Sequence, residues 1–491
     1  MISVKAKSPK GKITLKDFSK MGLHNKGTNT EVNCAQLYNF NNNNKVLEKG
    51  LGIKSLTVYP ANDITAEPYA LDYQALGLEY FNKVMYFKQY FSYTNQTAHR
   101  LLFHGSDGKL YVFQMFSSAN MLNWTYQIVF DTIPIVLEYK KDGLDSILIS
   151  ANDKLMVWST GYTPYELSNV PTITSMSVYN DVLYCTIAGE SDKIWYTSNL
   201  DPESVGTESD STKYFTLSDE CGSCRKMVNF KENLYVFRDY GISRLNTYAK
   251  SEPTYNQIYL SDSKIYPNTV SVCGDCVIFI TRDGVYKFNG VSVSKIDVLQ
   301  NLLIDSINEY AVAANLQDSY YLALRLNFND DNIVGCETEA DMKNNALIKL
   351  NLHDYSFEII RGVDIKDMLA LKAEIEEKII VTFNSLHKDK IGEITNDGKC
   401  FDEVLPRVYR TNNIVQEQME DITIRKMLVE GSKDVLLKVI TDENEYSFTT
   451  YCDGINNFQS IIPCKMFKLE VSSNIENPSV NLIQLEYIKR N

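Results

Sequence analysis

Short apolar runs separated by tight polar turns recur along most of the chain. In each copy an apolar strand leads into a turn of two or three residues, and a second, aromatic-rich strand follows. One clear copy joins Met227–Phe230 to Leu234–Phe237, and the next joins Thr269–Cys273 to Val277–Ile280. Asp, Asn and Gly occupy these turns because they tolerate the positive φ that tight hairpins require. The pattern therefore predicts a series of β-hairpins.

The hairpins recur with a period that defines the fold class. Copies begin near residues 101, 146, 175, 226, 271, 311 and 368, a mean spacing of about 44 residues, which is the length of a four-stranded propeller blade. A single meander cannot bury both of its faces, whereas radial packing of several blades covers them. We predict a mainly β protein with a β-propeller of six to eight blades. Stacked β-sandwiches are the competing interpretation, and the blade-sized period favours the propeller.

The pattern changes near both ends of the chain, and these changes define four segments. Residues 1–65 form an extended N-terminal strap or a partial blade, and residues 66–402 form the propeller. Residues 403–420 are a polar connector. Residues 421–491 carry five or six alternating strands, which is typical of a small C-terminal β-sandwich.

One helical pattern interrupts the strands. Apolar residues from Val298 to Ile307 recur at intervals of three and four, which predicts an amphipathic helix between Asp297 and Tyr310. We expect this helix to pack on a rim of the propeller.

Composition agrees with a β protein and limits its relation to nucleic acid. The 491 residues include 32 tyrosines and only 12 prolines, and 44% of them are apolar. The net charge of −13 argues against a protein that grips nucleic acid by neutralising phosphates. It is compatible with a wall along which a polyanion slides, and also with a charge that serves only solubility.

The N-terminus and the cysteines suggest where the protein is made. Lysine-rich polar residues follow Met1, so we expect no signal peptide. No apolar run approaches the ~18 residues needed to cross a bilayer, so we expect no membrane contact. Synthesis in a cytoplasm would make the ten cysteines free thiols.

Two CxxC motifs are the sharpest chemical signal. Cys221 and Cys224 form the first pair, and Cys273 and Cys276 form the second. Four such cysteines are a zinc pattern when the pairs converge. However, the first pair precedes the first strand of its repeat, whereas Cys273 ends the equivalent strand of the next. This alignment would separate the pairs by roughly 15 Å, the length of a strand. We therefore predict no metal and no cofactor, with these four cysteines as the zinc candidates.

No motif of a common enzyme class is present. The five histidines show no metal-ligand spacing, and GxSxG, P-loop and GxGxxG motifs are missing from the sequence. Some propellers are glycosidases, which need paired carboxylates. The acids here cluster in loops, as in 203–210, 330–331 and 337–341, and we expect these loops to be solvated. We predict a protein without enzymatic activity and assign no catalytic residue.

Specific residues resemble a known family. Pro267–Ser271, Gly274-Asp275, Phe279, Arg282–Tyr286 and Asn289-Gly290 resemble a blade of bacteriophage tail propellers. In that blade a strand led by Ser or Thr reaches a Gly turn and ends in an aromatic hairpin containing Asp-Gly.

The N-terminal segment resembles the opening of phage proteins that stabilise packaged DNA or form a tail nozzle. The residues that carry this likeness are Asn33–Ala35, Leu37, Asn39, Leu47 and Gly50–Leu56. The chain departs from the family at Cys34, where an acid is usual, and at Glu48-Lys49, where Arg-Pro is common.

The resemblance implies a structural virion protein of a phage tail or neck, assembled in the host cytoplasm. Such proteins form a homo-oligomeric ring, commonly six-fold, against a portal adaptor or tail ring. The ring is a nozzle or plug that retains packaged double-stranded DNA and later conducts it without binding it specifically. The alternatives are a host-receptor or glycan-binding propeller of the tail and a glycosidase-like hydrolase.

Overall fold

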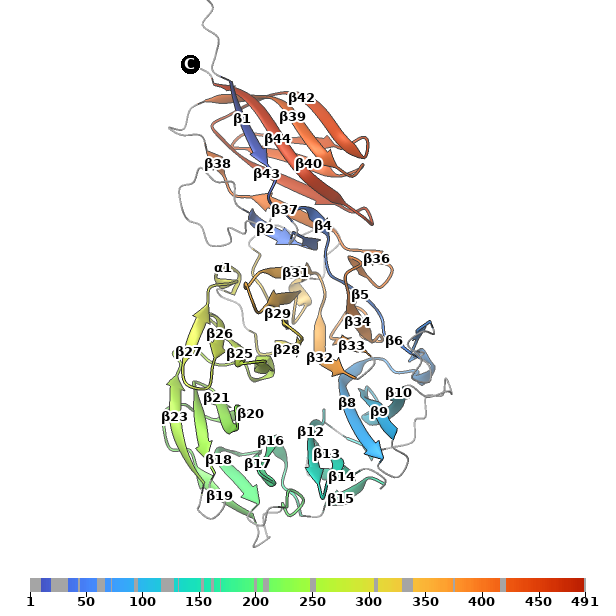
Figure 1. Ribbon diagram of the computed structural model, residues 1–491, viewed down its shortest axis with the longest axis vertical. Helices are drawn as coiled ribbons and strands as arrows, with labels where there is room; N and C mark the ends of the chain where they lie inside the picture. The colour runs from blue at the N-terminus through green and yellow to red at the C-terminus, as the bar shows by residue number, and fades with distance from the viewer. Residues whose placement is uncertain are drawn as a thin grey trace, which may run out of the picture.

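A computed structural model shows a ring of β-sheets with a β-sandwich mounted on one side (Figure 1). It describes residues 10–18, 34–42, 45–59, 67–71, 73–91, 96–115, 128–130, 132–151, 154–159, 163–167, 169–197, 201–205, 212–247, 253–303, 308–328, 339–373, 376–415 and 421–489. In this part of the chain, six four-stranded sheets and one six-stranded sheet form seven blades. The predicted propeller with a C-terminal sandwich is therefore confirmed.

Each of the first six blades is an antiparallel meander of four consecutive strands, whose first strand lies nearest the centre of the ring (Figure 1). Blade 1 consists of β8 (Phe81–Phe91), β9 (Gln96–Gly105), β10 (Lys109–Met115) and β11 (Ile128–Val129). Blade 2 consists of β12 (Ile135–Lys141), β13 (Leu144–Ala151), β14 (Lys154–Ser159) and β15 (Tyr165–Leu167). Blade 3 consists of β16 (Ile173–Tyr179), β17 (Val182–Ile187), β18 (Glu190–Thr197) and β19 (Thr212–Thr216).

Blades 4 to 6 continue the series. Blade 4 consists of β20 (Cys224–Phe230), β21 (Asn233–Arg238), β22 (Gly241–Asn246) and β23 (Thr254–Leu260). The short helix η2 (Pro267–Thr269) precedes blade 5, which consists of β24 (Ser271–Cys273), β25 (Cys276–Thr281), β26 (Gly284–Phe288) and β27 (Val293–Ile296). Blade 6 consists of β28 (Val312–Leu316), β29 (Ser319–Leu324), β30 (Ala346–Asn351) and β31 (Phe357–Arg361), with η3 (Glu339–Asp341) before β30.

In the first two blades the repeats seen in the sequence begin one strand later than the blades themselves. The repeats near residues 101 and 146 are β9 and β13, the second strands of blades 1 and 2, and not their first strands. The first strands β8 and β12 carry charged residues such as Lys83 and Glu138 that face the channel. These charges hid the apolar pattern that identifies a buried strand.

Blade 7 combines strands from the end of the propeller with a strand from residues 1–65, the segment expected to be a strap or a partial blade. It contains β32 (Ile365–Lys372), β33 (Glu377–Phe383), β34 (Gly392–Thr395), β35 (Lys399–Cys400) and β36 (Glu403–Val404). The N-terminal strand β5 (Gly52–Ser55) lies between β34 and β35, antiparallel to the first and parallel to the second. The two-stranded sheet of β6 (Thr57–Val58) and β7 (Tyr69–Ala70), followed by η1 (Gln74–Leu76), leads from there to blade 1.

A separate hydrophobic cluster fills the space between each pair of neighbouring blades. In β13, for example, Ile147 and Ile149 pack against blade 1, whereas Leu148 packs against blade 3. The last blade closes on the first through Leu371, Ile380, Phe81 and Leu101. Strands in the middle of a blade are therefore apolar on both faces, because each face is covered by a neighbour.

The sandwich contains more of the chain than residues 421–491. One sheet joins β3 (Phe40–Asn41), β4 (Leu47–Lys49), β39 (Ile422–Gly431), β42 (Gly454–Cys464), β44 (Ser479–Lys489) and β1 (Lys10–Leu15). The other joins β2 (Cys34–Tyr38), β37 (Arg407–Thr411), β38 (Ile414–Val415), β40 (Leu436–Thr441), β41 (Glu445–Thr449) and β43 (Met466–Ser473). Strands β37 and β38 lie in the segment expected to be a connector.

The predicted helix is shorter than expected. The helix α1 spans Gln300–Leu303, and residues 304–307 lie outside the described part of the chain. Leu299 has a left-handed φ of 60°, so the backbone cannot be helical before Gln300. Val298, Leu299 and Leu303 still pack into the cluster between blades 5 and 6, as their apolar spacing indicated.

Two buried residues fix the propeller to the sandwich. Asn39 has a φ of 60°, donates from its amide to the Pro406 carbonyl at 2.6 Å and accepts from the Arg361 backbone N–H at 2.9 Å. Arg407 donates to the carbonyls of Ile475 at 2.6 Å and Gly398 at 2.9 Å. Two side chains of the sandwich thus satisfy buried backbone groups of the propeller, the Arg361 N–H and the Gly398 carbonyl.

Removing side-chain volume from β5 should weaken the closure of the ring. Ile53 is fully buried between blades 6 and 7. We expect Ile53→Ala to lower the free energy of unfolding by about 2–5 kcal/mol, measured by urea denaturation. Ile461→Ala, at a side chain that is 65% exposed, is the control and should change stability by less than about 0.5 kcal/mol. Equal effects of the two changes would show that β5 does not hold the ring.

The closure should also depend on pH through Glu393 in β34. Burial opposes ionisation of Glu393, but Lys378 at 2.8 Å and the Thr57 N–H at 3.1 Å hold its pKa below the ordinary value. A lowered carboxyl pKa stabilises the fold above the unfolded-state pKa, and this contribution is lost as the pH falls through the folded-state pKa. We expect Glu393→Gln to cost about 1.5–3 kcal/mol at pH 7. The difference from wild type should shrink below a pH of about 4.3, as measured by urea denaturation across pH.

Candidate functional site in the central channel

The two CxxC pairs lie in different surroundings. Cys224 begins β20, whereas Cys273 ends β24 and faces Cys276 across a two-residue turn. Burial raises the pKa of Cys221 to about 11 and those of Cys224 and Cys273 to about 12. These thiols are protonated at neutral pH in the metal-free protein. The described residues contain no group of three or more metal-ligating side chains.

Two of the acids expected in solvated loops are buried instead. Glu203 accepts hydrogen bonds from Tyr139 at 2.6 Å and from Tyr165, and it pairs with Lys141 at 2.8 Å. It therefore ties the segment after β18 to blade 2.

Glu339 makes the second buried contact. It pairs with Arg361 at 3.0 Å, and the Arg361 guanidinium also lies 4.0 Å from the centre of the Phe328 ring. The acids at 206–210, 330–331 and 337–338 lie outside the described residues.

The residues of the family resemblance occupy turns and close contacts. Gly274 and Gly290 have φ of 59° and 101°, and the Asn289 side chain accepts the N–H groups that close its turn. Gly50 donates its N–H to the Asn39 carbonyl at 3.2 Å, and a Cβ at Gly50 would lie 2.8 Å from that oxygen. These residues shape the backbone and present no reactive group.

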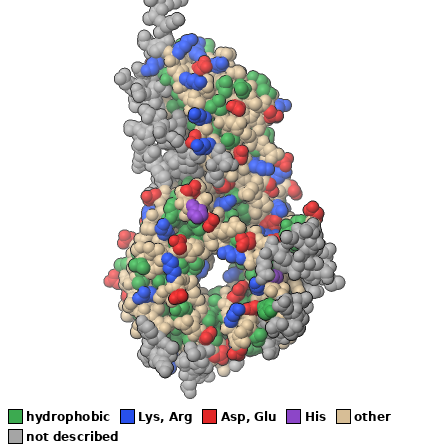
Figure 2. Space-filling view, viewed as in Figure 1, with side chains coloured by type: hydrophobic (Ala, Val, Ile, Leu, Met, Phe, Trp, Pro, Cys, Tyr) green, Lys and Arg blue, Asp and Glu red, His purple; other side chains and the backbone are tan. Residues whose placement is uncertain are grey.

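An open passage runs through the centre of the propeller (Figure 2), with basic and acidic side chains around it. A cavity of about 540 Å³ lies in this channel, which is within the range of small-ligand sites. First strands from blades 1, 2, 4, 6 and 7 line it. The chemistry-bearing side chains are Lys83, Glu138, Lys226, Lys366 and Asp367, together with Asn82 and Asn268.

Irregularities at the start of several first strands direct these side chains into the channel. The pairing register shifts between Phe81 and Lys83 in β8, between Cys224 and Lys226 in β20, and between Ile365 and Asp367 in β32. An extra residue in one strand locally changes where the following side chains point. The same feature at equivalent places therefore brings Lys83, Lys226 and Asp367 to one end of the channel.

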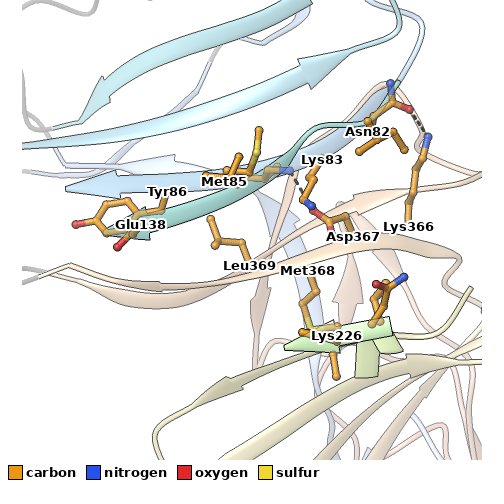
Figure 3. A pocket seen from close by; sticks show the side chains of 16 residues that line it. Asn82, Lys83, Met85, Tyr86, Glu138, Lys226, Lys366, Asp367, Met368 and Leu369 are labelled. Carbon is orange, nitrogen blue, oxygen red and sulfur yellow. Dashed lines mark hydrogen bonds between the residues drawn. The ribbon is translucent and has the colours of Figure 1, made fainter. Parts of the chain in front are cut away.

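The three lysines have no carboxylate partner. Lys366 Nζ donates to Asn82 Oδ1 at 2.5 Å, and Lys226 Nζ donates to the Val270 carbonyl at 2.8 Å. Lys83 makes neither a hydrogen bond nor an ion pair within the described part of the chain, and no ion pair there includes Lys226 or Lys366. Figure 3 shows Lys83 and Asp367 side by side and Lys366 reaching Asn82.

The electrostatics of the cavity follow from burial and from like charges. Burial, reinforced by Lys83, lowers the pKa of Lys226 to about 8. Burial, reinforced by Lys343, lowers the pKa of Lys366. Burial raises the pKa of Asp367, although Lys83 and the Val84 N–H at 3.1 Å oppose this rise. The cavity is thus a place where cations repel one another and the nearest carboxylate only partly compensates them.

Glu138 is the second carboxylate of the cavity. Burial raises its pKa, with a smaller contribution from Asp145. It lies beside Tyr86, at the far end of the cavity from Lys366 (Figure 3). A glycosidase places two carboxyl groups on either side of one scissile bond. Here the two carboxyl groups lie in different parts of the cavity, each beside different side chains.

The sequence did not predict the lysine cluster, because each lysine lies in a different repeat. An alignment of the first strands would have placed Lys83 and Lys226 at equivalent positions, directly after the register shift. That alignment required β8, which the apolar pattern did not reveal.

Comparisons with known proteins give only distant structural similarities. No family model and no curated protein matches the chain. Among solved structures, BamB from Moraxella catarrhalis is similar over 75% of this chain and 96% of its own, with 10% identity and a TM-score of 0.37. The N-terminal domain of Nup159 is similar over 70% of this chain and 95% of its own, with 10% identity and a TM-score of 0.37. Hsv2 of Kluyveromyces lactis is similar over 57% of this chain and 97% of its own, with 9% identity and a TM-score of 0.32. The order of strands within the blades, and not these similarities, identifies the chain as a β-propeller protein.

The structure also bears on membrane association. None of the described helices is both long and apolar enough to span a bilayer.

Removing one channel lysine should change the titration of another. We expect Lys83→Met to raise the pKa of Lys226 from about 8, because a like charge is removed. The measurement is the NMR titration of ¹³C-methylated lysines, with Lys226→Arg identifying the resonance. Lys154→Met, at an exposed position in β14, is the control and should leave that titration unchanged. A Lys226 signal that titrates near 10.4 in both proteins would contradict this description of the channel.

Proposed function

We propose that this protein is a non-enzymatic structural subunit of a phage tail or neck. It assembles into a homo-oligomeric ring, a nozzle or plug that retains packaged DNA and then conducts it. The observation that carries the proposal is the path of the N-terminal segment, which contributes strands to both sheets of the sandwich and then to blade 7. Two of the residues that resemble the nozzle family, Asn39 and Gly50, lie at this junction.

A subunit that carries mechanical load benefits from domains that cannot rotate independently. Asn39 and Arg407 join the sandwich to the propeller through buried hydrogen bonds to the Arg361 N–H and the Gly398 carbonyl. A hinge between the domains would expose these polar groups, or leave them without partners, at a cost of about 1–3 kcal/mol each. The two domains therefore act as one rigid block, which suits a repeated unit of a ring.

The DNA path would lie between subunits and not through a propeller. The cavity in the propeller channel, at about 540 Å³, has the size of a small-ligand site. We therefore assign the hole for the duplex to a ring of several copies. The net charge of −13 suits a wall that repels the phosphate backbone.

A glycan-binding propeller is the second candidate, because several tyrosines are exposed. Tyr214 is 51% exposed and Tyr310 is 56% exposed. Sugars stack on open aromatic faces, but Lys193 lies 4.6 Å from the centre of the Tyr214 ring and Lys343 lies 4.3 Å from that of Tyr310. Trp195 also lies 4.7 Å from Tyr214. These contacts favour the structural role over glycan binding.

Electron microscopy of phage particles labelled with an antibody to this protein tests the proposal. We expect label in a ring at the neck or tail, around a hole at least about 20 Å wide. We also expect no detectable binding of duplex DNA by fluorescence anisotropy at physiological salt, because the protein is acidic. Particles without label, or label at scattered sites, would overturn the structural role. Saturable binding on a glycan array would support the second candidate.

A further inference from the structure

The three lysines of the central channel form a cluster whose charges the protein itself compensates only in part. They come from β8, β20 and β32, which belong to blades 1, 4 and 7, and they line one cavity. All three are half-buried, so each has lost part of its hydration while remaining in contact with the cavity. Bringing like charges together away from bulk water is unfavourable unless an anion joins them.

The polar groups around the lysines do not neutralise them. The partners of Lys226 and Lys366 are a carbonyl and an amide oxygen, which are neutral. Asp367 is the nearest carboxylate, and one of its oxygens already accepts the Val84 N–H at 3.1 Å. Asn268 adds a side-chain amide to the lining. The cavity is therefore richer in donors and cations than in anions, although the whole chain is acidic.

We propose that this cavity is a binding site for a small anion bearing phosphate groups, held by Lys83, Lys226 and Lys366. A phosphate group suits the cluster because it carries more than one negative charge and its oxygens accept hydrogen bonds from several directions. Lysine binds phosphate as a flexible point charge, so ammonium groups from three strands can converge on it. A single carboxylate would leave two of the three cations uncompensated.

The size of the cavity limits which phosphate compounds fit. At about 540 Å³ it holds a short polyphosphate, a nucleotide or the phosphorylated end of a single strand. The cavity lies within a single propeller, so this site is separate from the duplex path that we propose between subunits. The inference therefore does not depend on the proposed structural role, and either can fail alone.

Isothermal titration calorimetry with tripolyphosphate tests the site on the full-length protein. We expect saturable binding with one site per chain. Lys226→Met should weaken it by roughly tenfold or more, because a charge-assisted hydrogen bond is lost. The triple change Lys83→Met, Lys226→Met and Lys366→Met should abolish it. Lys154→Met, which removes an exposed charge in blade 2, should bind as wild type does.

A substitution that should strengthen binding distinguishes a binding site from a merely structural cluster. Asp367→Asn keeps an oxygen for the Val84 N–H but removes the negative charge near Lys83. We expect it to tighten tripolyphosphate binding several-fold. Binding by wild type should weaken as the pH rises through about 8, and Lys226→Arg should remove this decline.

Two further titrations identify the source of the phosphate. Equal binding of tripolyphosphate and ATP would assign a free-phosphate or nucleotide site. Stronger binding of a short 5′-phosphorylated single strand would assign a nucleic-acid end. The absence of saturable binding by all three probes would overturn the proposal, as would binding that the triple change leaves intact. Circular dichroism of each variant verifies the fold, and we expect the substitutions to be tolerated because they relieve repulsion.

Discussion

The pairing of β5 with β34 and β35 is the interaction on which the rest of the structure depends. A ring of blades has to join its last blade to its first, and a chain that simply ended after β34 would leave an open sheet edge. Here a strand from residues 52–55 fills that position in blade 7. The chain then continues through Leu56 and Val58, which pack between blades 7 and 1. Closure is thus achieved by hydrogen bonds and by apolar burial on both sides of the same strand.

This closure also determines how the sandwich is attached. The segment that reaches β5 has already passed through β1 to β4 in the two sheets of the sandwich. Fixing β5 in blade 7 therefore holds the N-terminal half of the sandwich in place, while the chain after β36 supplies its C-terminal half. Asn39 and Arg407 complete the junction with buried hydrogen bonds. The propeller and the sandwich consequently share two chain segments.

The channel chemistry is a consequence of the same closure. Asp367 accepts the Val84 N–H, and Lys366 reaches Asn82, although about 283 residues separate the partners in sequence. Blade 1 and blade 7 are neighbours only because the ring is closed. Lys226 then approaches from blade 4, across the channel. A cluster of cations that no local segment contains is therefore assembled by the topology of the ring.

The sequence alone revealed the features that depend on local order. Hairpins such as 227–237 and 269–280 could be predicted from apolar runs, from turns of Asn, Asp and Gly, and from a blade-sized period. These signals are local because each hairpin forms between neighbouring residues. The separation of Cys224 from Cys273 also followed from the alignment of their repeats. Strands with weak apolar patterns were missed: β8 and β12 face a charged channel, and β42 is an edge strand with the exposed Ile455 and Ile461.

Other features were decided by the tertiary structure. The sequence could not assign β1 to β5 to their sheets, because strand pairing between distant segments depends on the whole fold and leaves no local pattern. The same holds for the burial of Glu203 and Glu339, whose partners Lys141 and Arg361 come from other elements. Lys83, Lys226 and Lys366 look like ordinary surface residues in the sequence, and only a closed ring places them together. Local order determined the blades, whereas long-range pairing decided how they close and what the channel contains.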